Sequence, residues 1–126
     1  MPTPVLVGVN DLFFSSKITA PANQLGIPMK CFPSCDHILT TAKEVFPGLI
    51  ILDLESVLGD PIALIRTLKK DKKMGDALIL VFGRHTNAEK LTEAKNAGAD
   101  QVMPRSEFVE VLPEILRSWS QTDKSS

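Results

Sequence analysis

The chain has 126 residues, of which 44% are hydrophobic and 23% charged, and its formal net charge is −1. This length suits one domain with a sizeable core, and the composition is that of a globular protein rather than a disordered one. The small net charge attracts neither nucleic acid nor an anionic membrane strongly, so we expect neither as a partner. The first residues match neither a signal peptide nor a membrane span, and we therefore expect a cytoplasmic protein.

Short apolar runs alternate with helical patterns along the chain. The apolar runs predict five strands, and the segments between them have the periodicity and the end signals of helices. The expected strands are 4–9, 27–31, 49–54, 77–82 and 101–103; the expected helices are 12–25, 34–46, 60–71, 86–97 and a last one that reaches Trp119.

Several helix ends are marked by particular residues. Asp60 followed by Pro61 predicts a capped helix start with proline in the first turn. Thr86 and Glu89 have the spacing of a capping box for the fourth helix. Pro113 lies inside the last helical pattern, where it predicts a kink or a later start.

Five strands in strict alternation with five helices indicate a single α/β domain, a doubly wound parallel sheet covered on both faces. Residues 1–119 are expected to form this domain and residues 120–126, "SQTDKSS", a polar tail. Ligands of such folds bind at the carboxyl ends of the strands. The residues expected at those ends are Asn10, Asp11, Asp53, Gly83, Arg84, His85 and Arg105.

The strand ends lack the motifs of common enzyme classes, and we expect no enzyme. The loop "VNDLFFSS" after the first strand has neither a glycine-rich turn nor a P-loop lysine, which disfavours nucleotide and flavin chemistry. There is no G-x-S-x-G motif. Neither His37 nor His85 has a nucleophile nearby in sequence, which disfavours a hydrolase.

Cys31 and Cys35 are the two cysteines of the chain. In a cytoplasmic protein they are expected to be reduced rather than joined in a disulfide. With His37 they offer three zinc ligands, one fewer than structural zinc sites usually have, so ordinary thiols are the favoured interpretation.

A resemblance to a known family rests on the element order, on "LIILDLESVLGDPIALIRTLK" around Asp53 and on "AKNAGADQVMPRSEF" before the last helix. In these features the chain resembles the receiver domain of bacterial two-component response regulators. The resemblance runs from Pro4 to Trp119 and implies the flavodoxin-like (βα)5 receiver fold, with Asp53 at the phosphoaccepting position. Such receivers take a phosphoryl group from a histidine kinase and pass the change to an output partner.

The resemblance also implies a Mg²⁺ site, formed by the acceptor and an acidic pair after the first strand. That pair falls on Val9, which cannot bind the metal, and Asn10, whose neutral amide binds it weakly. Asp11 is expected either to substitute as a ligand or to cap the next helix. Weakened Mg²⁺ binding is therefore expected, with Asp53, Asn10 and Asp11 as candidate ligands.

The other implied positions also differ from the family pattern. The phosphoryl-binding lysine falls on Arg105, which keeps the charge with a different geometry, whereas another alignment would place Met103 there. The switch hydroxyl and the switch aromatic fall on Gly83 and Val102, which supply neither group. Gly83 and Arg84 join Arg105 as candidates for contact with the phosphoryl group, and Arg84 and His85 could contact another anion instead.

These departures favour a stand-alone receiver-like signalling module that works without phosphorylation by binding a protein partner. The alternative is a working phosphorelay receiver that accepts its phosphoryl group on Asp53, and a second alternative is a small-ligand binder or enzyme on the same scaffold. The partner and the oligomeric state stay open. A plainer alternative for Asp53 is a hydrogen-bonded carboxylate that caps a loop. The lysines in 69–73 are most simply a solvated helix end.

Overall fold

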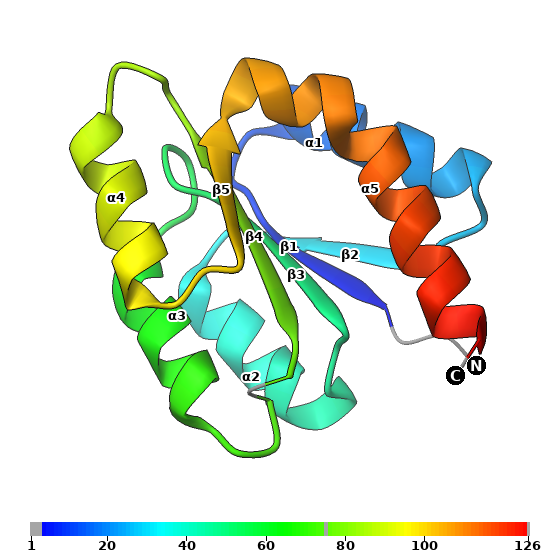
Figure 1. The fold of residues 1–126 in the computed structure, drawn as a ribbon, viewed down its shortest axis with the longest axis horizontal. Helices are drawn as coiled ribbons and strands as arrows, with labels where there is room; N and C mark the ends of the chain where they lie inside the picture. Colours follow the sequence, from blue (N-terminus) through cyan, green and yellow to red (C-terminus); the bar gives the residue numbers. More distant parts are fainter. Residues whose placement is uncertain (1–3, 75, 126) are drawn as a thin grey trace.

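The computed structural model describes residues 4–74 and 76–125, with the side chains of the last helix as far as Trp119. The described strands form one parallel sheet in the order β2-β1-β3-β4-β5, which confirms the predicted doubly wound fold (Figure 1). The strands are β1 (Val5–Gly8), β2 (Met29–Phe32), β3 (Leu49–Asp53), β4 (Leu78–Gly83) and β5 (Gln101–Pro104), and the helices are α1 (Leu12–Gln24), α2 (Cys35–Val45), α3 (Pro61–Lys70), α4 (Ala88–Ala97) and α5 (Arg105–Ser125).

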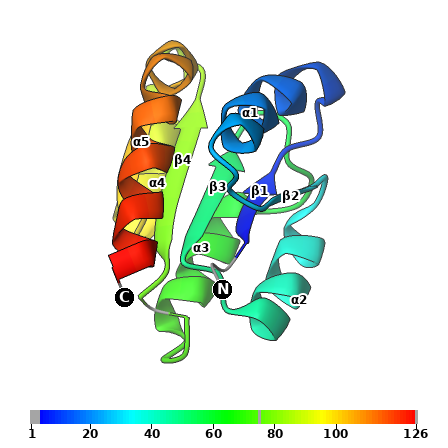
Figure 2. The same ribbon diagram turned by 90° about the vertical axis from the view of Figure 1, so that its right-hand side faces the viewer.

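The helices cover both faces of the sheet. Figure 1 shows α1 and α5 together on one side and α2, α3 and α4 on the other, and Figure 2 gives the same arrangement from the side. Side chains alternate along each strand, so Val7 and Ile51 pack toward α1 and α5, whereas Leu6 and Ile50 pack toward the other three helices. This double burial explains the continuous apolar run of β3.

Most predicted helix ends are confirmed, but the capping box is wrong. Asp60 caps α3 by accepting a hydrogen bond from the Ala63 N–H at 3.1 Å, and Pro61 is the first helical residue. The N-cap of α4 is Asn87, one residue after Thr86, so Thr86 does not hold the position that a capping box requires. The Asn87 side chain makes a tertiary hydrogen bond instead, described below.

The last helix begins at Arg105 and continues through Pro113, which excludes the later start. It runs past Trp119 to Ser125, while the division into a domain and a tail at residue 119 stays a prediction. In the described ranges, no helix combines the length and the apolar character that crossing a bilayer requires.

Lys69 does not belong to a solvated helix end, so that interpretation is wrong for this residue. Its ammonium group donates to the Asp100 carboxylate at 2.8 Å and to the Ala77 carbonyl at 3.0 Å. Asp100 also accepts from the Ile79 N–H at 2.7 Å. The end of α3 is thereby tied to the starts of β4 and β5. Lys70, by contrast, is exposed.

Candidate functional site

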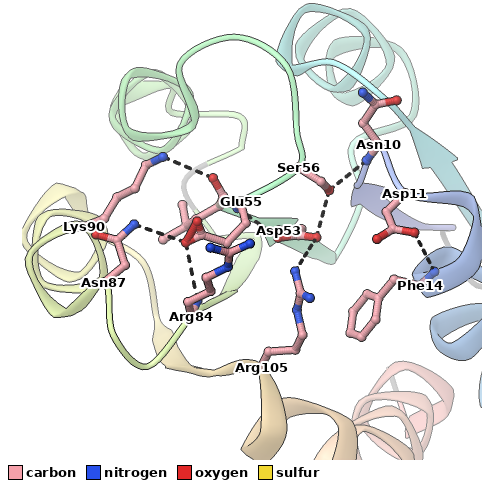
Figure 3. Close-up of polar contacts among 11 residues, drawn as sticks. Asn10, Asp11, Phe14, Asp53, Glu55, Ser56, Arg84, Asn87, Lys90 and Arg105 are labelled. Atoms are coloured by element: carbon pink, nitrogen blue, oxygen red, sulfur yellow. Dashed lines mark hydrogen bonds and ion pairs between the residues drawn. The ribbon is translucent and has the colours of Figure 1, made fainter.

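The residues expected at the strand ends do converge. Asp53 is the last residue of β3, Gly83 is the last of β4, and Arg105 is the first of α5. Asn10 and Asp11 follow β1, which is hydrogen-bonded to β3. Because all strands are parallel, these ends meet at one edge of the sheet, where Figure 3 shows the polar contacts around Asp53.

Asp53 is fully buried, with 0% of its surface exposed, and both of its carboxylate oxygens have partners. Oδ1 accepts a hydrogen bond from the Glu55 N–H at 2.9 Å, and Oδ2 accepts one from the Ser56 hydroxyl at 2.8 Å (Figure 3). The Arg105 Nη2 lies 3.7 Å from Oδ2. A buried carboxylate is tolerated only with such compensation, and here neighbouring groups of the protein supply it.

Ser56 is one of the residues of this site that the sequence did not reveal. Besides donating to Asp53, its hydroxyl oxygen accepts a hydrogen bond from the Asn10 N–H at 3.0 Å. Ser56 therefore connects the segment after β1 to the carboxylate at the end of β3. A serine three residues after an aspartate is a weak local signal for a side-chain hydrogen bond, and no motif includes it.

Arg105, the residue that the preferred alignment puts at the cationic position, lies beside Asp53. At 3.7 Å its contact with Asp53 is an ion pair rather than a hydrogen bond. The guanidinium carbon lies 4.8 Å from the centroid of the Phe14 ring, in cation–π geometry. Its Nε atom is buried and has no hydrogen-bond partner among the described residues. Met103, the alternative, is 9% exposed and belongs to the core.

The other candidate magnesium ligands, Asn10 and Asp11, lie in the segment after β1. Val9 is buried in the core between the sheet and α1. The Asn10 side chain points away from Asp53, whose network it meets through its backbone N–H (Figure 3). Asp11 caps α1, since its Oδ1 accepts from the Phe14 N–H at 3.0 Å.

A magnesium ion prefers several oxygen ligands, including carboxylates. In residues 4–74 and 76–125, no group of three or more His, Cys, Asp or Glu side chains is placed to hold a metal. Asp53 is the carboxylate at the centre of the network, and its two oxygens are already engaged. With Asp11, the other candidate carboxylate, engaged as a helix cap, this donor set is poor for the ion that the receiver resemblance implies.

Gly83 and Val102, at the two positions that the resemblance implies for the switch, lie at the end of β4 and within β5. Gly83 is buried at the end of β4, and Val102 packs against the core beneath α2, α3 and α4. Arg84 is exposed. Its backbone N–H joins the network by donating a hydrogen bond to the Glu55 Oε1 at 3.4 Å.

Glu55 is a second residue that the sequence did not reveal. Its Oε1 accepts from the Asn87 Nδ2 at 3.1 Å as well as from the Arg84 N–H. Burial raises the pKa of Glu55, but these two hydrogen bonds and the positive charges of Lys90 and Arg84 outweigh burial, so the pKa is lowered from its usual value. The Lys90 ammonium group also donates to the Leu54 carbonyl at 3.2 Å. Together these contacts fasten the loop after β3 to the loop after β4.

Cys31, on β2, and Cys35, the first residue of α2, are free thiols, as expected. Burial raises the pKa of both, and the charges of Asp60 and Asp36 raise that of Cys35 further. Both thiols therefore favour the neutral form, which binds metals poorly.

Of the comparisons with known proteins, the one with solved structures finds proteins of the same fold. No protein-family model matches the chain, and no curated protein does. Among solved structures, the chemotaxis response regulator CheY4 of Vibrio cholerae is similar with a TM-score of 0.80 and 17% identity, over 94% of this chain and 98% of that one. The receiver domain of a sensor histidine kinase from Pseudomonas aeruginosa PAO1, which has a magnesium ion in its active-site cleft, has the same TM-score and coverage at 14% identity.

An orphan response regulator of H. pylori is also similar, with a TM-score of 0.76 and 14% identity over 92% of this chain and 94% of that one. Identities this low show the fold alone. Element order, strand order and these likenesses together show that the chain has the flavodoxin-like (βα)5 fold of receiver domains.

Proposed function

We propose that the chain is a receiver-like signalling module of the two-component type, which acts by binding a protein partner without phosphorylation of Asp53. The fold supports the first part of this proposal. The observation that carries the second part is the state of Asp53, a fully buried carboxylate whose two oxygens accept hydrogen bonds from Glu55 and Ser56. The proposed role is recognition in the cytoplasm, and not catalysis.

The chemistry of phosphoryl transfer supports this view. An aspartate that attacks phosphorus needs an available oxygen, and it needs positive charge to offset repulsion from the phosphoryl oxygens. In this site, Oδ2 of Asp53 accepts the Ser56 hydrogen bond, which makes that oxygen a weaker nucleophile. Arg105 is the one cation that pairs with this carboxylate within 4 Å among the described residues. The carboxylate of Asp11, the other acidic candidate for a metal ligand, is engaged in capping α1.

One observation favours a second candidate function, a working phosphorelay receiver. Arg105 stands 3.7 Å from Asp53, at the place where a cation would offset charge on a phosphoryl group. In that case an Asp53 oxygen would attack the phosphorus of a phosphohistidine in a kinase, and the histidine nitrogen would leave. No comparable observation favours the small-ligand or enzyme alternative.

Incubation with acetyl phosphate and Mg²⁺ distinguishes the two functions. We expect the intact mass of the protein to stay unchanged under conditions that phosphorylate a conventional receiver run in parallel. An added phosphoryl mass that appears in the wild type and is absent from Asp53→Asn would contradict the proposal and establish the second function. Asp53→Asn is a close steric match, and its folding is verified by circular dichroism.

A further inference from the structure

A cleft of about 610 Å³ opens beside Arg105. Three parts of the chain form it: the first turns of α1, the loop between β4 and α4, and the start of α5. We call it the cationic cleft and define it by the side chains that the argument uses, which are Phe13, Lys17, Arg84, His85, Arg105 and Val109.

Positive charge is concentrated in the cationic cleft. The whole chain has a net charge of −1, yet Lys17, Arg84 and Arg105 line this one cleft together with His85. Asp11 is the acidic residue in the lining, and its carboxylate is engaged in capping α1. Within the described part of the chain, neither Lys17 nor Arg84 forms an ion pair with a carboxylate within 4 Å. The cleft is therefore complementary to an anionic partner.

The same cleft also exposes apolar surface. Phe13 is 74% exposed and Val109 is 45% exposed, and Leu12, next to Phe13, is 90% exposed. The Lys17 ammonium group lies 4.9 Å from the centroid of the Phe13 ring, so charge and apolar surface are interleaved. A small inorganic anion would leave this apolar surface in water. A peptide that carries both acidic and apolar side chains would cover it.

We propose that the cationic cleft binds an acidic segment of a partner protein, with carboxylates facing Lys17 and Arg84 and an apolar side chain on Phe13 and Val109. This inference rests on the proposed function, because it gives the surface and the chemistry of the partner. Arg105 lies both in the cleft and 3.7 Å from Asp53. A partner carboxylate that draws Arg105 toward itself would weaken the ion pair with Asp53, which couples the docking surface to the strand-end site.

The proposal is tested with a fluorescein-labelled peptide of about ten residues, in which glutamates flank a central Phe-Leu pair. Fluorescence anisotropy measures its binding to the full chain. We expect saturable binding that weakens as salt is added, because the charges are at the surface. Lys17→Glu, Arg84→Glu and Phe13→Ala are each expected to weaken binding about tenfold, a typical cost for an important interface side chain. All three residues are exposed, so the fold is expected to tolerate the changes.

Two variants control for nonspecific effects. Lys43→Glu makes the same change of charge on α2, on the other face of the sheet, and Leu58→Ala shortens an exposed apolar side chain outside the cleft. Both are expected to bind the peptide like the wild type. The proposal is overturned if the peptide does not bind at millimolar concentration, or if the controls weaken binding as much as the cleft variants. Equally tight binding of a DNA oligonucleotide of matched charge would also overturn it, because it would show attraction to any polyanion.

The outcome is independent of the phosphorylation test. If acetyl phosphate does not phosphorylate the protein and the peptide does not bind, the docking surface is wrong and the proposed function stands. If acetyl phosphate does phosphorylate Asp53 and the peptide binds, the phosphorylation-independent function is wrong and the docking surface stands.

Discussion

At the scale of single residues, Asp53 is governed by the cost of burying a carboxylate. A charge taken out of water must be compensated by hydrogen bonds and opposite charge. Removing one partner of a buried charge therefore lowers stability more than removing a surface interaction does. Ser56 provides the shortest contact to Asp53, at 2.8 Å, whereas the Arg105 ion pair is longer, at 3.7 Å. Ser56 is therefore expected to contribute strongly to the stability of this site.

Replacing Ser56 with alanine tests this expectation. Ser56→Ala leaves Oδ2 of Asp53 without its hydroxyl donor and the Asn10 N–H without its acceptor. We expect the free energy of unfolding in urea to fall by about 1–3 kcal/mol. Ser16→Ala is the control, because the Ser16 hydroxyl is exposed and bonds only to the Leu12 carbonyl of its own helix. Equal losses in the two variants would show that Ser56 has no special role.

Glu55 leads to a prediction about pH. Its pKa is lowered in the folded protein, so its ionised form stabilises the fold above the unfolded pKa, and that contribution is lost as the pH falls through the folded pKa. The wild type should exceed Glu55→Gln in stability at neutral pH, and the difference should shrink once the pH falls below the ordinary glutamate value of 4.5. Urea unfolding at a series of pH values measures this. Glu110→Gln, an exposed position on α5, is the control, and a constant difference for Glu55→Gln would contradict the assignment.

At the scale of elements, β1 and β4 each end in a glycine, but packing leaves different amounts of room for a side chain at the two positions. A Cβ on Gly8 would lie 2.8 Å from the Leu52 Cδ2 and 3.1 Å from the Val57 Cγ2, so close packing against β3 and its loop excludes a side chain. A Cβ on Gly83 would meet its nearest neighbour, the Leu91 Cδ2, at 3.4 Å, which is an ordinary contact. Packing thus requires glycine in β1 and leaves room for a side chain in β4.

The matched pair Gly8→Ala and Gly83→Ala separates these cases. Overpacking at Gly8 is expected to cost about 1–3 kcal/mol and to lower the melting temperature clearly. Gly83→Ala is expected to change stability by less than about 1 kcal/mol, since its Cβ fits and the unfolded chain loses conformational freedom. Thermal unfolding followed by circular dichroism gives both values. A larger loss for Gly83→Ala than for Gly8→Ala would be inconsistent with this packing.

At the scale of the whole molecule, sequence patterns predicted the fold because each strand of a doubly wound sheet leaves a local signature. The run of β3 and the cap at Asp60 follow from nearby residues. Other features depend on contacts that are distant in sequence. The ion pair of Lys69 spans 31 residues, and the bond between Asn87 and Glu55 spans 32.

The same reasoning explains why the centre of the site was foreseen and its supports were not. Asp53 interrupts an apolar run, which is visible in sequence, whereas Ser56 and Glu55 look like ordinary loop residues until the ends of β1, β3 and β4 are brought together. The receiver resemblance implied that Val9 and Asn10 stand where acidic ligands would be, but the use of Asp11 as a helix cap became clear only from the structure.

The central claim is that Asp53 is held by the protein and is not available for metal-assisted phosphorylation. The most direct measurement is an amide NMR titration with Mg²⁺, followed by beryllofluoride as a mimic of the aspartyl phosphate. We predict no saturable shifts around Asp53, Asn10, Asp11 and Arg105 at millimolar Mg²⁺ with excess beryllofluoride. Saturable shifts centred on those residues, absent from Asp53→Asn, would contradict the account and identify a working acceptor site.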